Sequence, residues 1–447
     1  MSRKLLTLLA GLLIASLLLV ACGQAATPTA APAAEAPTAA LEAGAPAATP
    51  ETAADAAGAP VDITWWQLTT NDVLNAALKE IVASFEAANP GIKVTLEQRS
   101  IDAHKEALRV AMGTEAFPDL YFMWAGLGLG GEFVNGGASA PLNDAYASLG
   151  WEERFVPPTL ASVKQYGDYH GVPEVAHPQG LYYRKDLFEA AGITSIPTTY
   201  EELIAANDKL VASGVSPIQF GGTVNWHLMR LLDNLLETKC GAETHDALKF
   251  LKASWATEPC VAEAFTELKR WADNYIVKDF IGIDNAESTQ LMYAGLAAMA
   301  LEGDWQLANF EADGQDLANY GLFAFPTGTG RLYAFNQMNY VGANSPHKEE
   351  AIKFLDYLTS PAVQEKYLGT FGATSVTQGL TPPANPRPLD VTWKEILGAA
   401  TGVFENADQA FPLEVTTEYW RIMNSVAIGE MDPGSAGAEF QKFLDNR

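Results

Sequence analysis

The chain has 447 residues, with 28 lysines and arginines against 54 aspartates and glutamates, and a formal net charge of −26 at pH 7. Nucleic acids and anionic membrane surfaces repel a protein of this charge, so both are disfavoured as partners. At about 100–200 residues per domain, the length allows two domains, each with its own core.

The chain starts with a basic segment, an apolar segment and then small residues, which is the layout of an export signal. Arg3 and Lys4 precede the apolar residues 5–20, a run shorter than the roughly 20 residues of a membrane-spanning helix. Leu-Val-Ala-Cys at residues 19–22 resembles the lipobox of bacterial lipoproteins, which are cut before the cysteine and diacylated on its thiol. We therefore expect residues 1–22 to be a lipoprotein signal peptide. The acylated Cys22 would anchor the exported protein in the lipid bilayer at the outer face of the cytoplasmic membrane, at the cell surface or in the periplasm. The alternative is an ordinary signal peptide with an incidental cysteine.

Residues 23–60 are dominated by alanine, proline and threonine and contain no aromatic side chain. Such a segment buries too little apolar surface to offset the entropy lost on ordering, so we expect a disordered tether. An alanine-rich helix is the alternative, but prolines recur throughout the segment and interrupt helices.

From residue 61 onward, strand-like and helix-like patterns alternate, which is typical of an α/β fold with a parallel sheet. The first elements are strands at 63–66, near 94–96 and at 120–124, and helices at 71–89 and around 108–112. Further along we expect strands at 181–183, 296–301 and 321–325 and helices at 226–236 and 247–271, with a mainly helical C-terminal third.

Three sites carry helix-start signals. Thr198-x-x-Glu201 and Thr199-x-x-Glu202 are overlapping candidates for a capping box. Ser-Pro pairs at 345–346 and 360–361 each predict a cap followed by proline in the first helical turn.

Besides Cys22, the chain contains two cysteines, Cys240 and Cys260. Two cysteines in an exported domain suggest one disulfide, which would close a loop of roughly 20 residues and stabilise the fold by about 3 kcal/mol. Two unpaired buried thiols are the alternative.

Several blocks then resemble, in order and spacing, the family 1 extracellular solute-binding proteins, the maltose-binding-protein-like group. The blocks are Phe-x4-Pro-Gly-Ile-Lys-Val at 85–94, Phe-Pro-Asp-Leu at 117–120, Leu-Tyr-Tyr-Arg-Lys-Asp-Leu-Phe at 181–188, Pro-Thr-Thr-Tyr-Glu-Glu-Leu at 197–203, Gly-Leu-Ala-Ala-Met at 295–299 and Gly-Asp-Trp at 303–305. The resemblance covers nearly all of residues 61–447. The family usually has asparagine where this chain has Arg184, a position that looks structural.

The resemblance implies an α/β fold of the periplasmic-binding-protein type II kind, with two lobes and a hinge between them. Lobe 1 would comprise residues 61–171 and 338–372, and lobe 2 residues 172–337 and 373–447. It further implies the solute-binding component of an ABC importer, recognised by the membrane-spanning permease subunits. We expect a monomer that takes a carbohydrate, an oligosaccharide, into the interlobe cleft, with no cofactor, no metal and no catalytic residue.

Sugars offer hydroxyl groups and flat C–H faces, so a sugar site needs aromatic platforms together with polar partners. The resemblance places the following candidates at the cleft: Trp66, Met123, Trp124, His177, Trp226, Glu302, Asp304, Trp305, Asn336, Tyr419 and Trp420. Core packing is the alternative role for each aromatic residue. Trp65 points to the opposite face of its strand from Trp66 and is expected in the core.

Other readings remain open or are set aside. An acidic, tryptophan-rich cleft would also suit a polyamine or another cation. An exported glycosidase stays possible because the many acidic residues allow accidental carboxylate pairs, although no motif selects two of them; an adhesin-like surface lipoprotein is a third possibility. Gly-x-Gly-x-x-Gly at 126–131 is set aside as a dinucleotide site because we expect no helix to open there. The tyrosine pair at 182–183 is set aside as a metal site because it lies within a structural strand.

Overall fold

The computed structural model describes residues 60–381 and 384–447. The predicted signal peptide, Cys22 and the predicted tether up to residue 59 lie outside these ranges. Within them, no helix has the length and apolar character needed to cross a membrane. Over the same ranges, no group of three or more His, Cys, Asp or Glu side chains is arranged to hold a metal ion.

In the described part of the chain, nine strands form a mixed sheet in the order β2-β1-β3-β8-β4-β6-β5, with β7 beside β4 and β9 beside β8. The strands are β1 Val61–Leu68, β2 Ile92–Arg99, β3 Leu120–Trp124, β4 Val172–Arg184, β5 Ser216–Ile218, β6 Ala297–Gly303, β7 Tyr320–Phe323, β8 Arg331–Val341 and β9 Gly402–Phe404. β1 runs parallel to β2 and β3, whereas the long strands β4 and β8 pair antiparallel with each other. The predicted α/β class is confirmed.

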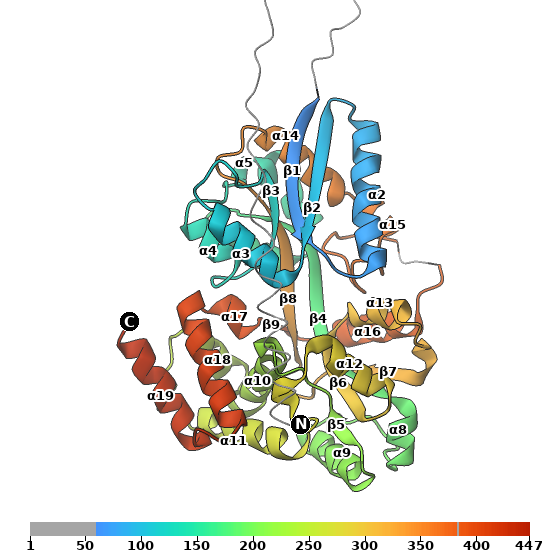
Figure 1. The fold of residues 1–447 in the computed structure, drawn as a ribbon, viewed down its shortest axis with the longest axis vertical. Coiled ribbons are helices and arrows are strands. Elements are labelled where there is room, and N and C mark those ends of the chain that lie inside the picture. The colour runs from blue at the N-terminus through green and yellow to red at the C-terminus, as the bar shows by residue number, and fades with distance from the viewer. Residues whose placement is uncertain (1–59, 382–383) are drawn as a thin grey trace, which may run out of the picture. The chain divides into compact units, whose positions relative to one another are not determined.

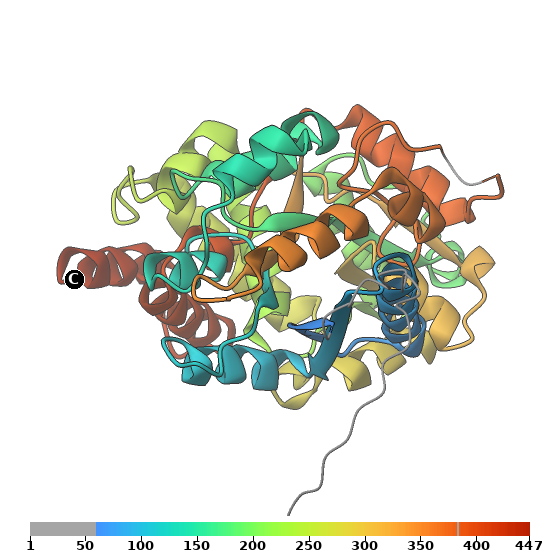
Figure 2. The same ribbon diagram turned by 90° about the horizontal axis from the view of Figure 1, so that it is seen from above.

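Helices surround the strands. Those of the first half are α2 Asp72–Ala88, α3 Ile101–Ala111, α4 Gly130–Asn135, α5 Asn143–Ser148, α6 Trp151–Arg154, α7 Pro157–Lys164, α8 Lys185–Ala190 and α9 Tyr200–Ala212. The second half contains α10 Asn225–Lys249, α11 Pro259–Asn274, α12 Asn285–Tyr293, α13 Gln306–Ala312, α14 Lys348–Leu358, α15 Pro361–Lys366, α16 Pro388–Ala399, α17 Ala407–Ala410, α18 Leu413–Ala427 and α19 Pro433–Asp445, with short 3₁₀ helices at Phe280–Gly282 and Leu317–Asn319. Figure 1 shows α2, α3 and α14 beside β1–β3, and α9, α10 and α12 beside β5 and β6; Figure 2 shows helices on several sides of the strands.

Two large hydrophobic cores form on either side of the middle of the sheet. The first joins β1, β3, α2 and α14, and the second joins α9, α10, α11, α18 and α19. A smaller cluster packs α16 against β4 and β7. Strand β4 contributes Val175 to the first core and Leu181 to the second, so the chain passes from one core to the other within a single strand.

Several predicted helix starts agree with the structure. Helix α2 is capped by Asn71, whose side chain accepts a hydrogen bond from the Leu74 amide, and Asn89 is its C-cap residue, as the pattern at 71–89 predicted. Of the two overlapping capping boxes, the structure forms the one between Thr199 and Glu202. Pro361 opens α15, as predicted.

Three predicted helices are wrong in their bounds. The helix expected at 226–236 continues as α10 to Lys249. The helix predicted at 247–271 is interrupted, because α10 ends at Lys249 and α11 begins at Pro259, a proline that is tolerated in a first turn but not in a helix interior. Helix α14 begins at Lys348 rather than after the Ser-Pro pair. Ser345 instead donates its hydroxyl hydrogen to Asp119 and accepts a hydrogen bond from the His347 amide, which makes it part of a turn.

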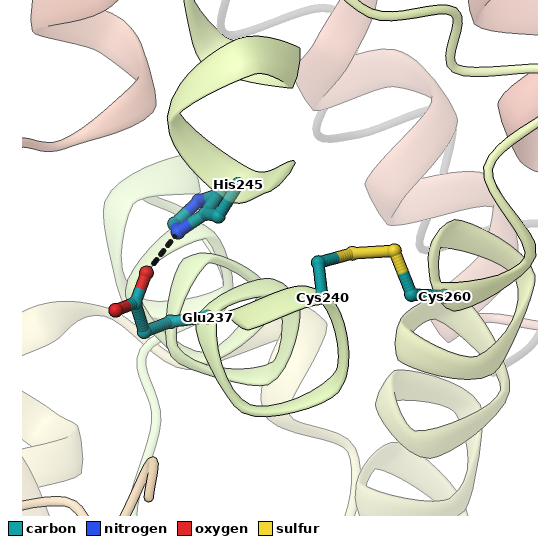
Figure 3. Close-up of a disulfide and its surroundings, with 4 residues drawn as sticks. All are labelled: Glu237, Cys240, His245 and Cys260. Atoms are coloured by element: carbon teal, nitrogen blue, oxygen red, sulfur yellow. Dashed lines mark hydrogen bonds and ion pairs between the residues drawn. A yellow bond between two sulfur atoms is a disulfide. The ribbon is translucent and has the colours of Figure 1, made fainter. Parts of the chain in front are cut away.

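Cys240 and Cys260, the cysteines predicted to pair, form a disulfide that ties α10 to the first turn of α11, with Cα atoms 5.0 Å apart (Figure 3). Gly241 follows directly with φ of 74°, a left-handed conformation that breaks the helical backbone beside the disulfide. After this break, His245 turns back to Glu237 with 2.7 Å between Nδ1 and Oε2 (Figure 3). Arg331 of β8 pairs with the same carboxylate through Nε and Nη2.

The glycine-rich segment at 126–131 serves close packing. A six-residue helix, α4, does open at Gly130, so the expectation that no helix begins there is wrong. A Cβ atom added at Gly126 would collide with the Gln409 backbone, and one added at Gly128 would collide with the Phe411 carbonyl. The Gly128 amide donates to the Gln409 carbonyl oxygen at 3.3 Å. The glycines therefore allow the turn after β3 to touch α17 backbone to backbone.

Candidate functional site

The ten tryptophans of the chain divide into two equal groups by burial. Five have less than 2% of their surface exposed and belong to the cores: Trp65, Trp151, Trp255, Trp271 and Trp393. The other five are half-buried, and they are the tryptophans that the sequence singled out as ligand platforms: Trp66, Trp124, Trp226, Trp305 and Trp420. A half-buried ring has one part held by the protein and another part open to contact.

Alternation along β1 separates the first pair. Trp65 packs edge-on against Phe354 in the core, and its Nε1 donates to Asn339 at 2.8 Å. Trp66 points to the other face, where the Arg99 guanidinium lies 4.0 Å from its ring centroid. Trp65 thus lies in the core as the strand period predicted.

Trp124 is the last residue of β3. Its ring packs edge-on against Phe122 with centroids 4.8 Å apart. Nζ of Lys105, on α3, lies 4.9 Å from the Trp124 centroid. Burial lowers the pKa of Lys105, and the nearby Asp408 carboxylate opposes that shift.

A second aromatic group forms around Arg230 of α10. The guanidinium carbon of Arg230 lies 4.2 Å from the Trp226 centroid and 5.2 Å from the Trp305 centroid. Trp226 stands one helical turn before Arg230, and Trp305 comes from the end of β6, so two distant segments meet at this side chain. Trp420 extends the group through α18, where its Nε1 lies 3.2 Å from the sulfur of Met229.

Glu302 holds Arg230 in place. Nη1 of Arg230 donates to Glu302 Oε2 at 2.6 Å and to the Leu301 carbonyl oxygen at 3.2 Å. His227 Nδ1 accepts a hydrogen bond from the Gly221 amide, so Nε2 carries the proton that faces Glu302 Oε1 at 3.0 Å. Burial raises the pKa of Glu302, but the charge of Arg230 and the bond from His227 outweigh it, and the net shift is downward. Glu302 is therefore ionised and paired.

Asp304 plays the same part for His177. His177 Nδ1 and Asp304 Oδ1 are 2.5 Å apart, and Asp304 Oδ2 accepts the Ala373 amide hydrogen at 2.6 Å. The His177 ring also meets Trp305 edge-on. His177, Glu302 and Asp304 are each at most 3% exposed, so their polar groups are engaged inside the protein beneath the aromatic rings.

The remaining predicted residues fall into two classes. Asn336 of β8 is 9% exposed and donates to Ser162 Oγ at 2.7 Å, while its carbonyl accepts the amide hydrogen of Ala125, next to Trp124. Met123 and Tyr419 were predicted as ligand contacts, but the structure buries both in the cores at 1% and 0% exposure.

The physical reason for this burial is that each residue adjoins a tryptophan that occupies the less buried side. Met123 precedes Trp124 in a strand, where neighbouring side chains point to opposite faces. Tyr419 precedes Trp420 in α18, about 100° around the helix, and its hydroxyl donates to buried Asp233 at 2.9 Å.

The sequence prediction missed the basic residues that contact the tryptophan rings, which are Arg99, Lys105 and Arg230. Arg230 follows Trp226 by four residues, a spacing that puts two side chains on one helix face, so this signal was present in the sequence. Two surface cavities, of 270 and 860 Å³, lie elsewhere and are lined by other residues, among them Leu397 in the first and Asp119 in the second.

Comparison with known proteins gives a consistent set of relatives. The model of the family described as bacterial extracellular solute-binding protein matches residues 70–365. The multiple sugar-binding protein of Streptococcus mutans is 24% identical over 331 residues, which cover 70% of this chain and 74% of that protein. The xylose/arabinose-binding protein XacG of Haloferax volcanii is 22% identical over 335 residues, covering 72% of this chain and 71% of that protein. Among solved structures, a chitin oligosaccharide binding protein superimposes with a TM-score of 0.79 at 25% identity, covering 87% of this chain and 99% of its own.

Proposed function

Because the chain belongs to the bacterial extracellular solute-binding proteins, we propose that it is the carbohydrate-capturing component of an ABC-type importer. Its ligand would be an oligosaccharide, bound and released without chemical change. The sugar ligands named for the Streptococcus mutans and Haloferax volcanii relatives, and for the chitin oligosaccharide binding protein, support the carbohydrate class.

The division of the tryptophans is the observation that carries the proposal. Half of them stay only half-buried, although a tryptophan side chain loses much favourable burial when it is left partly in water. They come from β1, β3, α10, α18 and the segment after β6. Brought together along one cleft, these rings and the polar groups near them would suit the alternating C–H faces and hydroxyl groups of an oligosaccharide.

We further propose that the aromatic set lines a cleft between two hinged lobes, residues 61–171 with 338–372 and residues 172–337 with 373–447. In this arrangement Trp66 and Trp124 would approach the ligand from lobe 1, and Trp226, Trp305 and Trp420 from lobe 2. Asn336 would lie at the end of the lobe 2 segment, next to the crossing into lobe 1. His177, Glu302 and Asp304 would act beneath the rings, fixing their orientation. Hinge closure of this kind is a common response of two-lobe binding proteins to ligand.

The remaining parts of the proposal concern location and partners. The protein would be exported, held at the outer face of the cytoplasmic membrane by acylated Cys22, and monomeric. Its closed form would be recognised by the permease subunits of the importer. Two acyl chains anchor a protein stably, whereas one chain binds the membrane only reversibly.

The test is calorimetric titration of the purified protein with mono- and oligosaccharides, and with polyamines beside them. We expect a saturable 1:1 isotherm with one class of sugar, and recovery of that sugar intact by mass spectrometry. At a ligand concentration 100-fold above Kd, the protein should gain about 2.7 kcal/mol of stability, so a thermal-shift screen can choose the candidates. Binding of polyamines alone would contradict the carbohydrate proposal, and cleavage of the sugar would point to a glycosidase.

A further inference from the structure

Arg230 stands where the proposed ligand would bind, yet half of its guanidinium is unused. It is 5% exposed and lies against the rings of Trp226 and Trp305. Nη1 makes the two bonds to Glu302 and Leu301 described above. Nε is buried, and no acceptor among the described residues lies within hydrogen-bonding distance of it.

An unpaired, buried N–H on a charged group is rare in folded proteins and calls for an explanation. Nε–H points along the same edge of the planar guanidinium as the N–H groups of Nη2. That edge is the fork with which arginine donates two parallel hydrogen bonds to one carboxylate. Glu302 accepts its hydrogen bond from Nη1, so this carboxylate leaves the fork formed by Nε and Nη2 vacant.

The other platforms also carry cations. Lys105 lies over Trp124 and Arg99 over Trp66, so together with the two rings at Arg230, four of the five half-buried tryptophans have a basic group of this chain at the ring. Arg99 is paired with Glu97. For Lys105, no carboxylate oxygen of the described residues lies within 4.0 Å of Nζ. This concentration of basic groups contrasts with the net charge of −26 of the whole chain.

The acidic groups nearby do not offset this pattern. Glu302 and Asp304 are engaged with Arg230, His227 and His177. Burial raises the pKa of Asp408, while the charges of Lys105 and Arg230 pull it back. Asp408 Oδ1 has no hydrogen-bond partner among the described residues, but two cations lie close enough to offset its charge. A cationic ligand would therefore find a carboxylate that is already neutralised, whereas an anionic ligand would find unused donors.

We propose that the ligand is an acidic sugar, an oligosaccharide containing a uronic acid whose carboxylate binds the vacant fork of Arg230 between Trp226 and Trp305. The inference rests on the proposed function and narrows its substrate class. Since Nε is covered in this structure, the carboxylate would reach the fork when the hinge between the lobes opens.

The test uses ligands that differ only in the acid group. The purified protein is titrated with trisaccharides of galacturonate, glucuronate and mannuronate, each beside its neutral parent sugar and its methyl ester. We expect at least one acid form to bind about 10- to 100-fold more tightly than both of its uncharged counterparts, as two charge-assisted hydrogen bonds would give. If no acid form binds better than its neutral counterpart, the inference is wrong, whereas the proposed function stands as long as a neutral sugar binds. If no sugar binds, the proposed function fails as well.

Arg230→Gln and Arg230→Lys provide the residue-level test, because lysine keeps the charge but lacks the fork. Both variants should lose most of the preference for the acid form over the methyl ester. Arg270→Gln is the matched control, since it removes one arginine charge from the surface of α11, and it should keep the full preference. Circular dichroism and thermal unfolding establish that each variant is folded. An unchanged acid-to-ester ratio in both folded Arg230 variants would overturn the assignment to Arg230, and the wild-type ligand comparison remains decisive should Arg230→Gln fail to fold.

Discussion

The ring of His177 meets the ring of Trp305 at 90°, with centroids 5.0 Å apart, while its Nδ1 is hydrogen-bonded to Asp304. His177 belongs to β4 and Trp305 follows β6, so one aromatic contact links a strand shared by both cores to a proposed sugar platform. Asp304 immediately precedes Trp305 in the chain. Its hydrogen bond to His177 therefore orients the ring that packs against Trp305.

His177→Ala should weaken sugar binding about 3- to 10-fold, because Trp305 loses the edge contact that orients its ring. Calorimetry gives the change in Kd, and the near-ultraviolet circular dichroism of the unliganded protein should lose intensity from a less ordered tryptophan. The ring of Phe335 contacts both His177 and Trp305, with its centroid 5.4 Å from that of Trp305, and would hold the tryptophan ring in part. An unaltered affinity would mean that Trp305 is oriented without His177.

Trp226→Ala should reduce affinity about 10-fold or more, whereas Trp226→Phe should retain most of it, because phenylalanine keeps an aromatic face. The matched control is Trp393→Phe in the buried cluster of α16. There the Nε1 hydrogen bond to the Tyr182 hydroxyl is lost, so the thermal midpoint should fall while Kd stays constant. If Trp393→Phe also weakened sugar binding, in proportion to its loss of thermal stability, the assignment of Trp226 as a ligand platform would be contradicted.

Acid should destabilise the protein through the Glu237–His245–Arg331 cluster. Burial lowers the pKa of His245 from 6.5 to about 4, and the hydrogen bond to Glu237 opposes this shift only in part. Between pH 6.5 and 4, the imidazole is therefore protonated in the unfolded chain and neutral in the folded protein. The free energy of unfolding should therefore drop as pH falls from 6.5 toward 4.

Glu237 extends the effect to lower pH. Burial alone would raise its pKa, but hydrogen bonds from His245 and Arg331 bring it from 4.5 to about 2, so its stabilisation is present above pH 4.5 and is lost as pH falls toward 2. Urea unfolding at a series of pH values measures both parts. His245→Gln should flatten the segment between pH 6.5 and 4; the same slope in this variant would assign the loss to other groups.

Cys22→Ser should release the protein from the membrane, because the serine hydroxyl is not a substrate for the thioether linkage of a lipoprotein. Fractionation of cells that express the full chain, followed by immunoblotting, measures the change. The variant should accumulate in the membrane-free fraction with the same sugar affinity. A variant that stays with the membrane would favour another mode of attachment, whereas a wild-type protein already in the membrane-free fraction would favour the ordinary signal peptide.

The sequence predicted the fold well where the signals were local. Asn71 and Asn89 bound α2 because a cap and a Pro-Gly stop are read within a few residues. The interruption between α10 and α11 was missed because the apolar period continues across it, and Pro259 was the signal that should have outweighed the period. The capping box forms at Thr199 and not at Thr198 because of the local backbone geometry. The two overlapping sequence patterns are the same, so the sequence could not distinguish them.

The half-buried positions of the five tryptophans were predictable from the sequence, whereas their charged neighbours were not. Strand alternation separated Trp65 from Trp66, but Tyr419 and Trp420 lie in a helix that touches the protein on more than one side, and only the packed structure assigns them. The contact of Arg230 with Trp305 spans 75 positions and depends on how α10 crosses β6, so no local pattern reveals it.

The glycines at 126 and 128 determine how near two parts of the molecule can come. In a protein that closes on its ligand, a methyl group at either position would meet the backbone of residues 409–411 before closure was complete. The open population would then grow, and the apparent affinity would fall in proportion to the lost closed fraction, even though no ligand contact had changed. Under the proposed hinge closure, the affinity for sugar would thus depend on the lack of a side chain at these two glycines as well as on the side chains that contact the ligand.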